Sequence, residues 1–139
     1  MEIYLDWFNR YLSKRLSNYT GIVNHGVVGG EYLASFGFER DVTDIVSGHV
    51  QAKRYLCLKR GEYYEKLSWA SKKTLEQQGG LMNEMQAVAF EQSPSFKEIL
   101  TVREYDERAK ESTWTDPEPL QYFLNLAKCY LDEKANRHQ

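Results

Sequence analysis

The chain has 139 residues and a formal net charge of −2, with 42% hydrophobic and 27% charged residues. Such values are ordinary for a soluble globular protein, and we expect a single domain over residues 1–139. The balanced charge offers no electrostatic basis for binding nucleic acid or an anionic membrane surface. The sequence holds no apolar run of about 18 residues that would span a membrane, and its acidic start argues against a signal peptide. We therefore expect a cytoplasmic protein.

Cysteine and proline usage favours an all-helical domain in a reduced compartment. Cys57 and Cys129 form no CxxC motif, so we expect neither a disulfide framework nor a thiolate metal site. The prolines all lie late in the chain, at Pro94, Pro117 and Pro119, and strand-like alternation is scarce. Apolar residues instead recur at helical spacing, which predicts an all-α fold.

The first two predicted helices span residues 3–19 and 22–36. The second carries His25, followed one turn later by Gly29 and Gly30. A glycine inside a helix costs about 1 kcal/mol relative to alanine. The pair is understandable if another backbone packs closely there, and it would place His25 beside that seam.

A third helix is predicted from a cap at Asp41 to a stop before Gly61, and it carries His49 and Lys53. Residues four apart lie on one face of a helix, one turn from each other. An imidazole there can hold a metal, while an ammonium one turn along holds an anionic substrate against it. For the pair alone, a satisfied buried histidine beside a solvated lysine remains the alternative.

A short helical turn is predicted over residues 62–66, followed by a helix that Ser68 caps and that Gly79 and Gly80 end. Polar side chains spaced three and four apart share one face of this helix: Ser71, Thr74 and Gln78. This face is either an anion-binding surface or simply solvated.

The next predicted helices cover residues 83–92 and the segment that begins with a cap at Ser95. The second of these carries Arg103, Asp106 and Lys110 at spacings of three and four. An intrahelical ion ladder, worth a few tenths of a kcal/mol per pair, is one interpretation of that spacing.

The last predicted helix starts at Asp116 and Pro117, where proline suits the first turn. From Asp132 onward we expect the polar chain to fray. We expect this helix to bury an apolar stripe: Leu120, Phe123, Leu124, Ala127 and Leu131.

Two groups of candidate site residues follow from these placements. The possible metal ligands come from three different helices, and their nitrogen and oxygen donors suit iron, manganese or zinc: His25, His49 and Asp106. A second group combines two cations with hydroxyl and amide donors, which suits a phosphoryl or phosphonyl group: Lys53, Ser71, Thr74, Gln78 and Arg103.

Over about residues 24–125 the chain resembles the HD-domain mixed-valence di-iron oxygenases of organophosphonate breakdown, which are relatives of myo-inositol oxygenase. The matching words are HxxxG at 25–29, HVxAKRYL at 49–56, LSxASxxTLxxQGG at 67–80, FE at 90–91 and RxxDxxAK at 103–110. The resemblance implies an HD-domain-like helical bundle. It also implies an iron centre that uses dioxygen to hydroxylate or cleave beside a phosphonate carbon.

The same resemblance implies roles for the candidate residues. His25 and His49 would bind the iron that meets the substrate, and Asp106 would bind the other iron. The phosphonate would be held by the polar group: Lys53, Ser71, Gln78 and Arg103, together with Thr74.

The chain departs from the family in its N-terminal part. The family has an upstream histidine and then a His-Asp pair whose aspartate bridges the metals, whereas none of the 24 residues before His25 is a histidine. We therefore expect an N-terminally incomplete bundle, at most one iron per chain, no activity of this chain alone and possible self-association. The alternatives are a non-catalytic protein that binds phosphonate or phosphate, and an HD-type metal-dependent phosphohydrolase.

Overall fold

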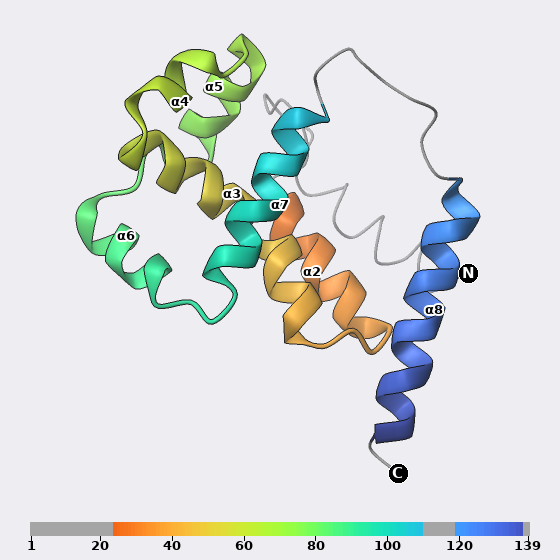
Figure 1. Cartoon of the computed structure of the whole chain (residues 1–139). Coiled ribbons are helices and arrows are strands. Elements are labelled where there is room, and N and C mark those ends of the chain that lie inside the picture. The colour runs from red at the N-terminus through yellow and green to blue at the C-terminus, as the bar shows by residue number, and fades with distance from the viewer. Residues whose placement is uncertain (1–23, 110–118, 138–139) are drawn as a thin grey trace, which may run out of the picture.

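The computed structural model describes residues 24–109 and 119–137, and every regular element in these ranges is a helix. The helices are α2 (His25–Ser35), α3 (Arg40–Lys59), α4 (Gly61–Lys66), α5 (Trp69–Gln77), α6 (Glu84–Glu91), α7 (Phe96–Arg108) and α8 (Leu120–Arg137) (Figure 1). The all-α prediction is confirmed for these ranges. The helix predicted over 3–19 and the predicted start of the last helix at 116–117 lie outside them.

Helix α3 is the element on which the other helices are arranged. It packs against α2, α7 and α4, and Figure 1 shows α4, α5 and α6 on one side of it and α8 on the other. Its inner surface carries Ala52 and Leu56, which are 0% and 1% exposed. Of the predicted site residues, His49 and Lys53 lie on α3, and His25, Arg103 and Asp106 lie on the helices α2 and α7 that pack against it.

Glycines allow α2 to lie close to α3. A Cβ atom built on Gly30 would lie 2.0 Å from Ser47 Oγ and 2.9 Å from the carbonyl oxygen of Thr43. At Gly29 it would lie 3.2 Å from a methyl group of Val46. The prediction that these glycines mark a close approach between backbones is confirmed.

The segment from α4 to α5 folds around a small core of Cys57, Leu67 and Leu75. The predicted cap at Ser68 is confirmed, because its side chain accepts a hydrogen bond from the amide of Ser71 at 3.2 Å. Helix α5 ends in two glycines with φ of 100° and 68°, a left-handed conformation that glycine adopts without steric penalty.

The predicted cap at Asp41 is wrong, whereas the predicted cap position at Ser95 is confirmed but lacks the capping hydrogen bond. The N-cap of α3 is Glu39, in an extended conformation, and Asp41 lies in the first turn. The carboxylate of Asp41 instead accepts a hydrogen bond from the hydroxyl of Tyr130 at 2.6 Å. Ser95 does precede α7, but its φ of −97° and ψ of 15° are not those of an extended cap residue, and its side chain makes no capping hydrogen bond.

Helix α8 is held to the rest through its C-terminal half. The ring of Tyr130 stacks on Phe38 with centroids 5.3 Å apart, and Lys134 forms ion pairs with Glu39 and Asp41. The expected fraying from residue 132 is wrong, because α8 continues as a helix to Arg137.

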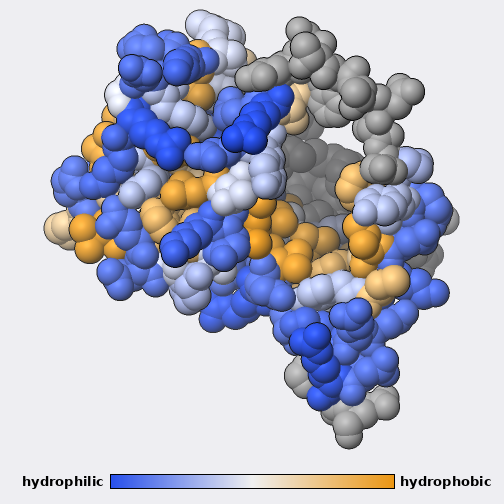
Figure 2. All heavy atoms as spheres, in the orientation of Figure 1, coloured by the Kyte–Doolittle hydropathy of each residue, from blue (hydrophilic) through white to orange (hydrophobic). Residues whose placement is uncertain are grey.

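The expected buried stripe of α8 is also wrong for its N-terminal half. Leu120, Phe123 and Leu124 are 73%, 51% and 53% exposed. Figure 2 shows apolar residues on the side of α8 that faces α2. The stripe predicted from periodicity exists, but no described helix covers its first turns. None of the described helices combines the length and apolar character that a membrane crossing needs.

Candidate metal and anion site

Two imidazoles meet where α2 begins against the middle of α3. His25 Nε2 lies 2.7 Å from His49 Nε2, and the ring centroids are 4.7 Å apart. The ring of His49 also fills the space beside Gly26, where a Cβ atom would lie 2.9 Å from its Cε1 atom. Sequence analysis did not single out Gly26, although a glycine directly after a candidate ligand was a signal that it could have used.

A backbone contact fixes the tautomer of His49. Its Nδ1 lies 2.8 Å from the carbonyl oxygen of Val46, and a carbonyl can only accept a hydrogen bond. Nδ1 therefore carries the proton, and the neutral ring presents its Nε2 lone pair toward His25. In this arrangement His25 Nε2–H donates to His49 Nε2. An imidazole whose Nδ1–H is held by a carbonyl, with Nε2 open, is a common form of metal-binding histidine.

The surroundings of His49 favour this neutral form. Burial is the main cause that lowers its pKa below the ordinary value, and the hydrogen bond to Val46 opposes it. Electrostatic interactions with His25 and Arg103 lower the pKa of His49 further, whereas the carboxylate of Asp106 raises it. At neutral pH the ring is thus available as a ligand rather than as a cation.

Asp106, the third predicted ligand, pairs with Arg103 and does not join the two histidines as a group of three ligands. Its side chain is 51% exposed and accepts a hydrogen bond from Arg103 Nη1 at 2.8 Å. Arg103 is buried, and it also donates to the hydroxyl of Tyr63 at 2.8 Å and to the carboxylate of Glu107. Within residues 24–109 and 119–137, no three His, Cys, Asp or Glu side chains are grouped so that they could hold a metal ion. The structure thus brings two of the three predicted ligands together.

The predicted anion-binding lysine lies one turn along α3 from His49. Lys53 is only 5% exposed, and its Nζ donates to Thr74 Oγ1 at 3.1 Å. Thr74 Oγ1 in turn donates to the carbonyl oxygen of Ser71 at 3.0 Å. The hydroxyl of Thr74 therefore orients the ammonium group, and α5 is the element that supplies it.

Gln78 follows the last residue of α5, the helix that contacts Lys53, and Arg103 lies on α7. The Oε1 atom of Gln78 is buried and has no hydrogen-bond partner, which costs about 1–3 kcal/mol unless a donor arrives. The charges of Lys53 and Arg103 both lower the pKa of Cys57, although burial of the thiol raises it overall. Both cations therefore act on the same small region near the C-terminal end of α3.

Arg54 is a buried cation to which sequence analysis assigned no role. It is 9% exposed and donates to the carbonyl oxygens of Gly80 at 2.8 Å and Gly79 at 3.3 Å. It also donates to the side-chain oxygens of Gln51 at 3.0 Å and Gln86 at 3.2 Å. The sequence signal was available, because no acidic residue stands three or four positions from Arg54 in α3, so its partners had to come from elsewhere.

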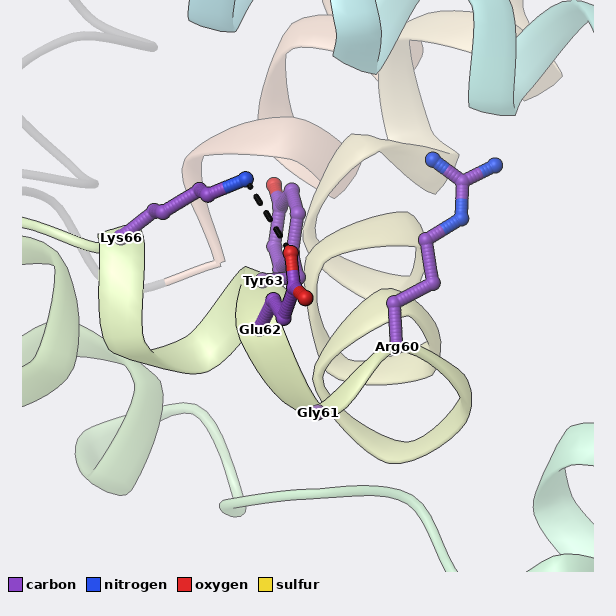
Figure 3. A pocket seen from close by; sticks show the side chains of 5 residues that line it. All are labelled: Arg60, Gly61, Glu62, Tyr63 and Lys66. Atoms are coloured by element: carbon purple, nitrogen blue, oxygen red, sulfur yellow. Dashed lines mark hydrogen bonds and ion pairs between the residues drawn. The ribbon is translucent and has the colours of Figure 1, made fainter.

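A surface depression of about 380 Å³ lies at the end of α3 and the start of α4, away from the imidazoles. Its lining residues are Arg60, Gly61, Glu62, Tyr63 and Lys66. Figure 3 shows Lys66 reaching toward Glu62 across Tyr63, with Arg60 on the other side. None of the predicted site residues lines it, and Arg103 contacts one of its lining residues, through the hydroxyl of Tyr63.

Comparisons with known proteins give relatives but no family model, since none of the family models searched matches this chain. An uncharacterised protein of Acanthamoeba polyphaga mimivirus is 40% identical over 116 residues, which are 84% of this chain and 52% of that protein. A glycine-betaine-forming 1-hydroxy-2-(trimethylamino)ethyl phosphonate dioxygenase of Leisingera caerulea is 42% identical over 94 residues, 68% of this chain and 47% of that enzyme.

A third relative is the hydroxymethylphosphonate dioxygenase of Gimesia maris, which is 37% identical over 105 residues, 76% of this chain and 52% of that enzyme. The chain thus spans about half the length of the curated relatives it matches. The chain is similar over most of its own length to two enzymes that are named phosphonate dioxygenases.

Proposed function

We propose that this chain binds a small organophosphonate or phosphate anion beside one iron ion, as part of a phosphonate dioxygenase-type activity. The observation that carries the proposal is the pairing on α3 of His49, whose Nε2 lone pair faces His25, with the buried Lys53 one turn along. The similarity to two named phosphonate dioxygenases supports the choice of anion and of metal chemistry.

The donor set fits one metal ion. Two nitrogens bound at about 2.0–2.1 Å to the same ion lie roughly 3 Å or slightly more apart, and the Nε2 atoms of His25 and His49 are 2.7 Å apart. A widening of a few tenths of an ångström, which breaks their hydrogen bond, would admit the ion between them. The described residues offer no carboxylate between the two rings that could bridge a second ion.

Bound iron would supply the activation of dioxygen, and the chain itself would bind and orient the anion. The ammonium of Lys53, oriented by Thr74, would neutralise the charge on a phosphonyl oxygen. Gln78 Oε1 would accept a hydrogen bond from a substrate O–H or N–H, which satisfies its unpaired acceptor. Arg103 would reach the anion by exchanging one of its carboxylate partners for a phosphonyl oxygen.

The anion site is tested with methylphosphonate and isothermal titration calorimetry. Charge-assisted hydrogen bonds contribute about 1.5–3 kcal/mol each, so Lys53→Ala should weaken binding by at least about tenfold. Lys59→Ala is the matched control, because Lys59 lies on the same helix but pairs with Glu84 at the surface. Equal titration curves for the parent and Lys53→Ala would contradict the proposal.

The metal site is tested by elemental analysis of protein purified with added iron, together with an oxygen electrode. We expect at most one iron per chain, removable by a chelator and lost in His49→Ala, because two imidazoles alone hold an ion loosely. We expect no oxygen-dependent release of phosphate from hydroxymethylphosphonate by this 139-residue chain alone. Two irons per chain would contradict this. Anion binding without iron uptake would favour a non-catalytic binding protein, and nucleotide hydrolysis without oxygen uptake would favour a phosphohydrolase.

A further inference from the structure

We propose that Arg54 is a positioning residue for the anion site. Its guanidinium holds the end of α5, the helix whose Thr74 contacts Lys53 and whose last turn leads into Gln78. This inference rests on the proposed binding of an anion at Lys53, and it adds a residue that would not touch the anion.

The geometry shows two neighbouring cations of α3 attached to the same short helix. Lys53 contacts the middle of α5 through Thr74 at 3.1 Å. Arg54 contacts the two residues that follow α5, through the carbonyl oxygens of Gly79 at 3.3 Å and Gly80 at 2.8 Å. Two attachments at different points along a helix fix both its position and its direction, which one attachment cannot do.

The turn that follows α5 has carbonyls that need a partner. The amides of Gly79 and Gly80 return to the carbonyls of Glu76 and Leu75 in the last turn of the helix. The carbonyls of Gly79 and Gly80 themselves lie beyond the helix, and Arg54 donates to both. A planar guanidinium can serve both of them and Gln86 at once, whereas a lysine ammonium on a different stem cannot reproduce that fork.

The link from Arg54 to the site runs through a single peptide unit. Gln78 directly precedes Gly79, so the carbonyl that Arg54 holds belongs to the residue after the unpaired acceptor. Helix α5 has only nine residues, too few to be stable without tertiary contacts. When the guanidinium is removed, we expect the end of α5 to move, and the side chain of Gln78 to move with it.

The first experiment measures methylphosphonate binding by calorimetry in Arg54→Met and Arg54→Lys. We expect about a tenfold loss of affinity for Arg54→Met and a smaller loss for Arg54→Lys, which keeps the charge and the fold. In the Arg54→Met background, Gln78→Leu should have almost no further effect, while Lys53→Met should still weaken binding.

A control separates positioning from a general loss of stability. Val28→Ala removes a buried methyl pair in α2, away from α5, and in that background Gln78→Leu should weaken binding as much as it does in the parent. Additive losses for Arg54→Met and Gln78→Leu would overturn the inference, because independent residues do not couple.

The second experiment needs no ligand. Hydrogen exchange at the amides of Gln78 and Gly80, both bonded within the end of α5, should accelerate at least about tenfold in Arg54→Lys, while the amides of α2 stay unchanged. Unchanged exchange at these two amides would overturn the inference. If methylphosphonate binds to none of the proteins, the proposed function fails, and the exchange result still decides whether Arg54 holds α5.

Discussion

Helices α2 and α8 are attached to the centre of the molecule in opposite ways. Helix α2 meets α3 through glycines, where Ser47 and a backbone carbonyl fill the space that side chains would need. Helix α8 is held by the ring of Tyr130, which stacks on Phe38, and by the polar ends of Tyr130 and Lys134, which reach Asp41 and Glu39. The first contact depends on close packing along a seam, and the second depends on one ring contact together with ion pairs and hydrogen bonds.

This difference decides which of the two attachments can hold the side chains of a binding site in fixed positions. A close-packed seam tolerates displacements of only a few tenths of an ångström, so it can hold His25 and His49 at hydrogen-bond distance. Partly exposed ion pairs are weak and screened by salt, so we expect salt to weaken the attachment of α8 more than the seam between α2 and α3. The predicted site residues of the described chain accordingly lie on α2, α3, α5 and α7 and not on α8.

The largest effect should come from filling the seam, with Gly30→Ala. The new Cβ would meet Ser47 Oγ at 2.0 Å and a backbone oxygen at 2.9 Å. Overpacking costs about 1–3 kcal/mol, and the better helix propensity of alanine returns up to about 1 kcal/mol. We expect a net loss of roughly 1–2 kcal/mol in the free energy of unfolding in urea, of which Ser47→Ala restores a part.

The matched control is Gly61→Ala in α4, where nothing lies within 4 Å of the new atom. It should leave the free energy of unfolding unchanged or raise it by up to about 1 kcal/mol. Equal destabilisation by the two substitutions would show that the seam is not closely packed.

A second effect concerns the two thiols, one beside the packed centre and one on α8. Cys57 is buried and Cys129 is exposed, and burial raises the pKa of the Cys57 thiol. Only the thiolate reacts with iodoacetamide, so Cys129 should be modified at least about ten times faster at neutral pH. Peptide mass spectrometry over time measures both rates, and urea should abolish the difference. Similar rates in native buffer would mean that the small core around Cys57 opens readily.

The smallest effect should be seen at the attachment of α8, with Tyr130→Phe. The tyrosine hydroxyl is the main cause that lowers the pKa of Asp41 below its ordinary value of 3.8. A carboxyl with a lowered pKa stabilises the folded chain above its ordinary pKa, and this stability is lost as the pH falls through the folded-state pKa. In Tyr130→Phe the pKa of Asp41, followed by carbon NMR, should rise toward 3.8.

Tyr55→Phe serves as the control for this titration, because its hydroxyl contacts Glu91 and not Asp41. It should leave the pKa of Asp41 where it is in the parent. A Tyr130→Phe titration identical to that of the parent would show that the contact between α8 and α3 does not form in solution.

The helices and much of the site follow from local signals. Apolar periodicity together with cap and stop signals predicted the described helices, the paired glycines predicted the seam, and spacing of four placed His49 and Lys53 on one face of α3. These signals act within one element, so a sequence reveals them directly. The roles of the predicted ligands and anion-binding residues remain predictions.

The errors concern contacts between elements that are distant in sequence. Asp41 has the chemistry of a cap, but Tyr130, 89 residues away, takes its carboxylate. The stripe of α8 has the correct period, but no local pattern says whether another helix covers it. The lack of an acidic neighbour one turn from Arg54 indicates that its partners lie elsewhere, but no local pattern identifies them as the carbonyls of Gly79 and Gly80.

The side chain of Gln86 has a consequence for the order of folding. Its Oε1 atom accepts from the amide of Asn83 at 3.1 Å, within the capping box that starts α6, and also from Arg54 at 3.2 Å. An eight-residue helix nucleates poorly by itself. The Gln86 side chain can accept its hydrogen bond from Arg54 only once α3 has formed. Helix α6 should therefore form late, by docking onto an existing α3, and in the native state it should unfold together with the end of α5 as one cooperative unit.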